Sequence, residues 1–198
     1  MITIGFLASG NGTSLRAIVA AIEAGALAAQ AGLVVSNNKN AAALTFARDH
    51  GIAARWIPTL GDPQAADADL IQALADAGVE LVVLSGYLRK LGPRVLAAYK
   101  NRILNIHPAL LPKFGGEGMY GRRVHEAVLA AKESVTGATV HLVDGQYDHG
   151  AIVAQARVIV RPGDTAEVIE AKVMAAEPGL YLDTLRRILS GALTLPAR

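Results

Sequence analysis

Over roughly the first 110 residues, short apolar runs alternate with longer segments of helical spacing, and this alternation restricts the fold more than any other feature. Short runs rich in Val, Ile and Leu are typical of buried strands, whereas the longer Ala-rich segments are typical of helices. Strands that alternate with helices form an open α/β sheet with parallel neighbours. The strand-like runs are 2–7, 32–37, 53–57, 79–86 and 102–106, and helical segments lie at about 14–24, 41–50 and 62–78.

The pattern changes after about residue 135, where two strand-like segments follow each other without a helix between them. Residues 136–145 and 151–160 flank a polar stretch, which predicts a β-hairpin. A last helix is expected at about 165–190. The sequence therefore predicts a single domain, residues 1–198, with an open, mostly parallel Rossmann-like sheet, flanking helices and a C-terminal β-hairpin plus helix.

Composition narrows the chemistry that this chain can perform. The absence of cysteine excludes disulfides, thiolate nucleophiles and Cys-based metal sites. The formal charge of +2 is scattered and few aromatic residues accompany it, so we expect a small anionic ligand and no nucleic acid. The N-terminus lacks the basic segment of a signal peptide, and no run of about 18 apolar residues is present. We therefore expect a cytoplasmic protein with no membrane partner.

The stretch "LNIHPALLPKF", residues 104–114, places an amide and an imidazole at the end of an apolar strand. Asn105 and His107 point to the same side because alternate strand residues share a face. Pro108 fixes its own φ and keeps His107 extended, so both polar groups are held toward one small volume. The plainer alternative is that Asn105 caps a turn while His107 is a hydrogen-bonded core residue. Their combination with two prolines favours a catalytic site.

The stretch "SGNGTS", residues 9–14, lies between the first strand and the first helix. Its glycines allow close backbone approach, and unpaired helix N–H groups beside the hydroxyls of Thr13 and Ser14 suit a phosphate. The third glycine of the dinucleotide motif is replaced by Leu15, and the sequence is not a P-loop. The alternative is that the glycines serve only to make a tight turn. We predict a monophosphate site that includes Gly12, Thr13 and Ser14.

Further polar residues occur at the ends of other predicted strands. Asp148 lies at the hairpin tip, where it is either a solvated turn residue or a carboxylate folded back over the sheet edge. His141 is expected in the core or beside the site, and His149 in solvent. Residues 86–91 end the most apolar strand and offer backbone groups to a planar heterocycle. The five histidines lack the spacing of a metal site, so we expect no metal.

Taken in order, several of these motifs resemble the phosphoribosylglycinamide formyltransferase family over essentially the whole chain. They are "SGNGTSL", "VVLSGYLRKL", "LNIHPALLPKF", "TGATVHLVDGQYDHGAIVAQ" and "AAEPGLY". The resemblance implies transfer of a formyl group from formyl-tetrahydrofolate, as co-substrate, to the amino group of glycinamide ribonucleotide in purine biosynthesis. The reaction would proceed by direct attack through a tetrahedral intermediate.

The resemblance also implies roles for individual residues. Asn105, His107 and Asp148 would be catalytic. The ribonucleotide would be bound by Gly12, Thr13, Ser14 and Glu177, and the folate by Leu88, Arg89, Lys90, Leu91 and Asn105. The Leu111–Pro112 peptide would be cis.

Two groups of alternatives remain open on sequence alone. One is the same chemistry with another acceptor, either water in a formyltetrahydrofolate hydrolase or a methionyl-tRNA or nucleotide sugar in another formyltransferase. The other is a non-catalytic folate or nucleotide sensor on the same scaffold. A sensor would be expected to lack one of the three catalytic residue types, and Asn105, His107 and Asp148 are all present.

Overall fold

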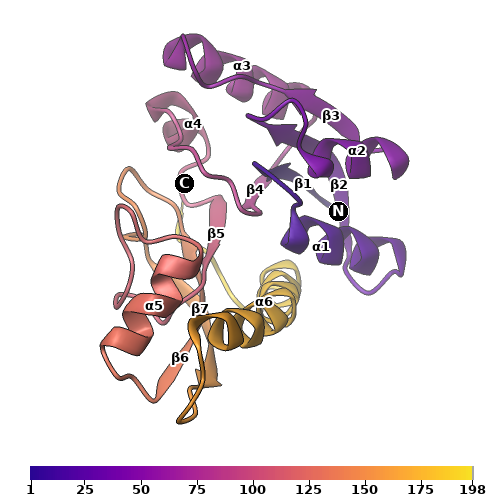
Figure 1. Cartoon of the computed structure of the whole chain (residues 1–198). Helices are drawn as coiled ribbons and strands as arrows, with labels where there is room; N and C mark the ends of the chain where they lie inside the picture. The colour runs from indigo at the N-terminus through magenta and orange to yellow at the C-terminus, as the bar shows by residue number, and fades with distance from the viewer. Residues whose placement is uncertain (198) are drawn as a thin grey trace.

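The computed structural model describes residues 1–197 and shows one seven-stranded sheet with helices on both faces (Figure 1). The strands are β1 (Ile2–Leu7), β2 (Ala29–Ser36), β3 (Ala53–Trp56), β4 (Leu81–Leu84), β5 (Ile103–His107), β6 (Val135–Leu142) and β7 (Ile152–Ile159). The helices are α1 (Thr13–Glu23), α2 (Ala42–Asp49), α3 (Pro63–Asp76), α4 (Pro93–Ala98), α5 (Arg122–Ala130) and α6 (Ala166–Leu189).

The strand order is β3-β2-β1-β4-β5-β6-β7. The pairs from β3 to β5 are parallel, whereas β5–β6 and β6–β7 are antiparallel. The predicted fold class is therefore confirmed, including the C-terminal hairpin and helix. Because the chain moves outward from β1 to β3 and then returns to β4, a switch point lies between β1 and β4, where open α/β sheets bind ligands.

Two apolar cores cover the two faces of the sheet. One contains Leu15 and Ile18 of α1, Leu44 of α2, and Tyr181 and Leu185 of α6, packed on the strands. The other contains the buried faces of α3 and α4. Figure 1 shows α3 and α4 on one side of the strands and α1 and α6 on the other. Burial on both faces explains why β4 is a continuous apolar run.

Side-chain caps define where two of the helices on the second face begin. The Asp62 side chain accepts hydrogen bonds from the amides of Gln64 and Ala65, and Pro63 occupies the first turn of α3. The buried Asp67 carboxylate of α3 accepts from the amides of Arg94 and Val95 at the start of α4. Asp67 thereby fixes the start of α4, which follows the carboxyl end of β4.

Some local expectations need correction. Strand β2 begins at Ala29, three residues earlier than the apolar run indicated. The Gly-rich stretch 114–123 becomes helical from Arg122 onward, and neither α4 nor α5 was predicted from the sequence. The cis peptide predicted between Leu111 and Pro112 is present. Within residues 1–197, no helix is long and apolar enough to cross a membrane.

Candidate active site

The predicted site residues gather at the carboxyl edge of the sheet, close to the switch point. The loop after β1, residues 8–12, and the segment after β4, residues 85–92, lie against each other. The Ser9 amide donates to the carbonyl of Gly86 at 3.1 Å, and the Ser9 hydroxyl accepts from the amide of Leu88 at 2.8 Å. Strand β5, which pairs with β4, ends at the same edge and carries the predicted amide and imidazole.

Asn105 and His107 lie on the same side of β5 and face the hairpin strand β6. In the β5–β6 register, Asn105 is opposite His141 and His107 is opposite Thr139. The Asn105 Nδ2 atom lies 3.1 Å from Nε2 of His141. His107 is 3% exposed, so its side chain is packed inside the protein and is not a surface group. The period-two argument therefore placed these two side chains correctly.

Asp148 folds back from the β6–β7 loop onto both histidines. Its Oδ2 atom lies 3.3 Å from Nδ1 of His107 and its Oδ1 atom 3.5 Å from Nε2 of His141. Oδ2 also accepts a hydrogen bond from the Gly116 amide at 3.0 Å. Burial alone would raise the pKa of Asp148, but the two histidines and the Gly116 amide outweigh it and lower this pKa below its usual value. Asp148 is therefore ionised at neutral pH.

The two nitrogens of His107 have different partners. Nε2 lies 2.7 Å from the backbone carbonyl of Phe114, which can only accept a hydrogen bond, so Nε2 carries a proton. Nδ1 faces the carboxylate of Asp148. Burial lowers the pKa of His107, and the opposing effect of Asp148 does not restore it. The neutral imidazole thus carries its proton on Nε2, and Nδ1 lies opposite the carboxylate of Asp148.

His141 orients the amide of Asn105. Its Nδ1 atom lies 2.9 Å from the carbonyl of Leu142, so Nδ1 carries a proton, and Nε2 lies opposite the Asn105 Nδ2 donor. Asn105 therefore presents its NH₂ group to His141, and one N–H of that group remains for another acceptor. The sequence left open whether His141 is a core residue or a neighbour of the site. In the structure His141 is buried and also contacts Asn105 and Asp148.

A small cavity of about 70 Å³ opens beside these groups. The segment after β4 forms one wall and the β6–β7 loop forms the other. Leu88 does not line this cavity and is 65% exposed, in contrast to the other three residues of the predicted folate segment. The lining residues are Leu84, Tyr87, Arg89, Lys90, Leu91, Asn105, His141, Val143, Asp144, Gly145, Gln146, Tyr147 and Asp148.

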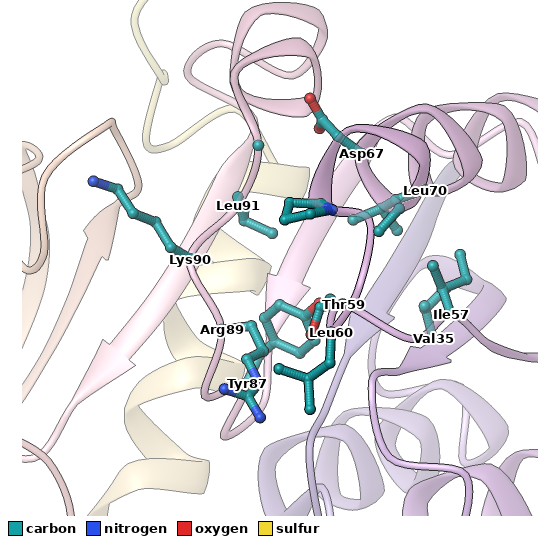
Figure 2. Close-up of a pocket in the computed structure, with 13 residues that line it drawn as sticks. Val35, Ile57, Thr59, Leu60, Asp67, Leu70, Tyr87, Arg89, Lys90 and Leu91 are labelled. Carbon is teal, nitrogen blue, oxygen red and sulfur yellow. The ribbon is translucent and has the colours of Figure 1, made fainter.

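A second cavity of about 210 Å³ lies on the α3 side of the same segment and shares part of its wall (Figure 2). Apolar side chains dominate its lining, with Arg89 at its edge. Burial raises the pKa of the Tyr87 hydroxyl to about 12, with Arg89 acting in the opposite direction. Figure 2 shows Lys90 pointing away from the other lining residues, and its Nζ atom lies 5.9 Å from the ring of Tyr147 in the hairpin loop.

The loop before α1 has the geometry expected of an anion cradle. Gly12 precedes the helix with a φ of 66°, in the left-handed region that glycine adopts without strain. Among residues 1–197, the amides from Gly10 to Ser14 donate no hydrogen bond to the protein. The next amide, that of Leu15, is already bonded to the hydroxyl of Ser85 at 3.0 Å. The free donors are therefore limited to the turn and the first residues of α1.

Glu177 approaches the same edge from α6. Tyr181, one turn further along the helix, donates its hydroxyl to the carbonyl of Leu104 at 2.9 Å, which fixes α6 against β5. Burial raises the pKa of Glu177 to about 7. Its carboxylate has no hydrogen bond or ion pair with residues 1–197. Such a carboxyl group is available to accept hydrogen bonds from a ligand.

Three contributors to this cluster were not identified from the sequence. They are the carbonyl of Phe114, the amide of Gly116 and the hydroxyl of Ser85. The first two are backbone groups of a Gly-rich loop, for which no side-chain pattern exists. Residues 1–197 contain no group of three or more His, Cys, Asp or Glu side chains that could hold a metal ion. That the protein uses no metal stays a prediction.

The fold and the location of these groups define an α/β protein whose candidate site residues gather at the carboxyl edge of a mostly parallel sheet. The chain belongs to the formyl transferase family, whose family model matches residues 2–185.

Within this family the chain is similar to phosphoribosylglycinamide formyltransferases. It is 37% identical to the chloroplastic protein of Vigna unguiculata over 91% of this chain and 58% of that protein. It is 34% identical to the Haemophilus influenzae protein over 97% of this chain and 89% of that one. The crystal structure of glycinamide ribonucleotide transformylase 1 from Symbiobacterium toebii superimposes with a TM-score of 0.90 at 37% identity, covering 100% of this chain and 92% of that one. The chain thus spans less than two thirds of the plant relative.

Proposed function

We propose that this protein transfers the formyl group of formyl-tetrahydrofolate to the amino group of glycinamide ribonucleotide in purine biosynthesis. The observation that carries the proposal is the cluster of Asn105, His107 and Asp148 at the same sheet edge as the free amides before α1. The relatives named as phosphoribosylglycinamide formyltransferases support the same substrates. Formyl-tetrahydrofolate acts as a co-substrate.

In the proposed reaction the amine attacks the formyl carbon and negative charge collects on the formyl oxygen. The N–H of Asn105 that is not used by His141 donates to this oxygen. His107, once protonated at Nδ1, has both N–H groups used by the Phe114 carbonyl and Asp148, and its positive charge stabilises the negative charge on this oxygen. Each donor of such an oxyanion hole contributes about 3 kcal/mol to the stabilisation of the transition state. Because neither residue forms a bond to carbon, no covalent enzyme intermediate is required.

Proton transfer completes the proposed reaction. The attacking amine must lose a proton, and the folate nitrogen must gain one when its bond to the formyl carbon breaks. Asp148 is ionised and faces Nδ1 of His107, so it stabilises the imidazolium and moves the proton, directly or through water. Holding the two substrates in attack geometry supplies the remaining acceleration.

The substrate-binding roles follow from the same geometry. The amides and hydroxyls of Gly12, Thr13 and Ser14 hold the ribonucleotide phosphate, and Glu177 accepts from its sugar hydroxyls. On the folate side, the small cavity between the segment after β4 and the β6–β7 loop receives the heterocycle. Of the proposed folate residues, Arg89, Lys90, Leu91 and Asn105 line this cavity. Leu88 does not, and its amide is bonded to the Ser9 hydroxyl.

A deformylation assay tests the proposal. Purified protein is given formyl-tetrahydrofolate with and without glycinamide ribonucleotide, and formation of tetrahydrofolate is followed together with the formylated ribonucleotide. We expect turnover only when the ribonucleotide is present, with one formyl group transferred for each folate released. Equally fast turnover in water alone would instead identify a hydrolase.

Other expectations from the sequence stay predictions. These are a cytoplasmic location, a single domain over residues 1–198, and the lack of a nucleic-acid or membrane partner. They agree with a chain that acts on two small soluble substrates.

A further inference from the structure

The turn that follows His107 is held by a hydrogen-bond network from the hairpin strands. The hydroxyl of Thr139, which is fully buried in β6, donates to the carbonyl of Ala109 at 2.6 Å. The same oxygen accepts from the amide of Leu111 at 3.0 Å and from Nε2 of Gln155 at 2.9 Å. A hydroxyl has one donor and two acceptor sites, so the hydrogen-bonding capacity of Thr139 is fully used.

Gln155 completes the network from the outermost strand, β7. Its Nε2 atom donates to the carbonyl of Leu111 at 3.0 Å and to the hydroxyl of Thr139. Both protons of the amide nitrogen are thereby used. Gln155 itself is exposed at the sheet edge. Its side chain thus reaches inward from the surface to the turn, although nothing in the proposed chemistry requires a contact with substrate.

The turn that this network fixes is followed by Phe114, whose backbone carbonyl faces Nε2 of His107 and so determines which nitrogen is protonated. After residues 109–112 the chain reaches Phe114, whose φ of 58° lies in the left-handed region. A non-glycine residue occupies this region at a cost, so surrounding contacts must maintain it. In this conformation the Phe114 carbonyl lies 2.7 Å from Nε2 of His107.

We propose that Gln155 and Thr139 are positioning residues for His107. By fixing the turn 109–112, they keep the Phe114 carbonyl against Nε2, so that the proton of the neutral ring is on Nε2 and Nδ1 faces Asp148. The inference rests on the proposed function for the role of His107 in turnover. The tautomer itself is a property of the free protein and can be measured independently.

The experiment combines ¹⁵N NMR of the histidine rings with steady-state kinetics on the full chain. The ¹⁵N shifts identify which ring nitrogen carries the proton, and the signals of His107 are assigned from their absence in His107→Gln. Gln155→Met keeps the length of the side chain and removes the donors. Arg157→Met is the matched control, because Arg157 is also exposed on β7 two residues away and its side chain makes no hydrogen bond with residues 1–197.

In the wild-type protein we expect His107 to be protonated on Nε2. In Gln155→Met we expect a mixture of the two tautomers and a kcat about tenfold lower, because the variant loses the hydrogen bonds to the turn and to Thr139. Each KM should change less than about twofold, because the variant loses no contact with a substrate. Arg157→Met should match the wild type. Thr139→Ser should retain the tautomer and most of the kcat, whereas Thr139→Val should lose both.

Other outcomes overturn the inference. An unchanged tautomer in Gln155→Met would show that the network does not control the Phe114 carbonyl. A shifted tautomer with an unchanged kcat would remove the positioning role in turnover. Should Thr139→Val fail to fold, Gln155→Met and Thr139→Ser still test the inference. If wild-type protein lacks formyl transfer but its tautomer depends on Gln155, the proposed function fails and the structural part of the inference stands.

Discussion

Nδ1 of His107 lies 3.3 Å from Oδ2 of Asp148, although one residue ends a parallel strand and the other belongs to the loop of an antiparallel hairpin. β6 runs antiparallel to β5 and ends opposite Leu104, and the loop that follows folds back so that Asp148 reaches both His141 and His107. Asp148 itself has a φ of 54°, in the left-handed region. The proposed chemistry depends on this one relationship between two folding motifs.

Replacing Asp148 by Asn should lower kcat by about 10²–10⁴, because the amide keeps the shape of the side chain but removes the charge that stabilises the imidazolium. The KM for the ribonucleotide should change little, since the proposed phosphate site is the distant turn before α1. The loss should also overlap with that of His107→Ala in a double-mutant cycle. Wild-type kcat in Asp148→Asn, or losses that multiply fully, would contradict the proposed partnership.

Gly12→Ala should weaken binding of the ribonucleotide selectively. An alanine there would occupy the left-handed region, and its Cβ would lie 3.0 Å from Leu15 Cδ2, so the turn should shift. We expect a KM for the ribonucleotide about tenfold higher and a stability loss of about 1 kcal/mol. Gly25→Ala is the control: its φ is 68°, its Cβ would meet nothing within 4 Å, and it lies beyond the other end of α1. Both variants should lose stability, but only Gly12→Ala should change KM.

Glu177→Gln should stabilise the ligand-free protein in a pH-dependent way. Burial raises the pKa of Glu177 from about 4.5 to about 7, so the folded chain binds more protons than the unfolded chain between these pH values. Stability therefore falls as the pH rises through this window. The variant should match the wild type near pH 4 and exceed it by about 2 kcal/mol at pH 8. Denaturant unfolding at a series of pH values tests this, and a difference independent of pH would contradict it.

Tyr181→Phe should destabilise the fold by about 1–2 kcal/mol, because it leaves the carbonyl of Leu104 without the hydroxyl of a fully buried side chain. Burial also raises the pKa of Tyr181 well above its usual value, so the hydroxyl is a donor at every pH of interest. Thermal and urea unfolding measure the loss. Tyr120→Phe serves as the comparison, since Tyr120 is 55% exposed and its hydroxyl makes no hydrogen bond with residues 1–197, and we expect no change there.

The positions of site residues could be predicted where a local sequence pattern has one expected backbone geometry. Alternation along β5 placed Asn105 and His107 on one side, and the glycines before α1 indicated a turn with free amides. Asp148 was predictable only through the family resemblance, because an aspartate in a hairpin loop is ordinarily solvated. Helix α5 was missed since its sequence follows four glycines and its buried face contacts α6, a partner that is distant in sequence.

The sequence by itself determined the order and type of nearly all elements and the presence of the three proposed catalytic residues, because strand alternation, helix spacing and glycine turns are local properties. Only the tertiary structure decided which nitrogen of His107 is bare, which atom orients Asn105, and how Gln155 reaches the turn after His107. These depend on backbone carbonyls and amides from distant segments. Every residue carries such groups, so no pattern of side chains distinguishes those that the fold brings to the site.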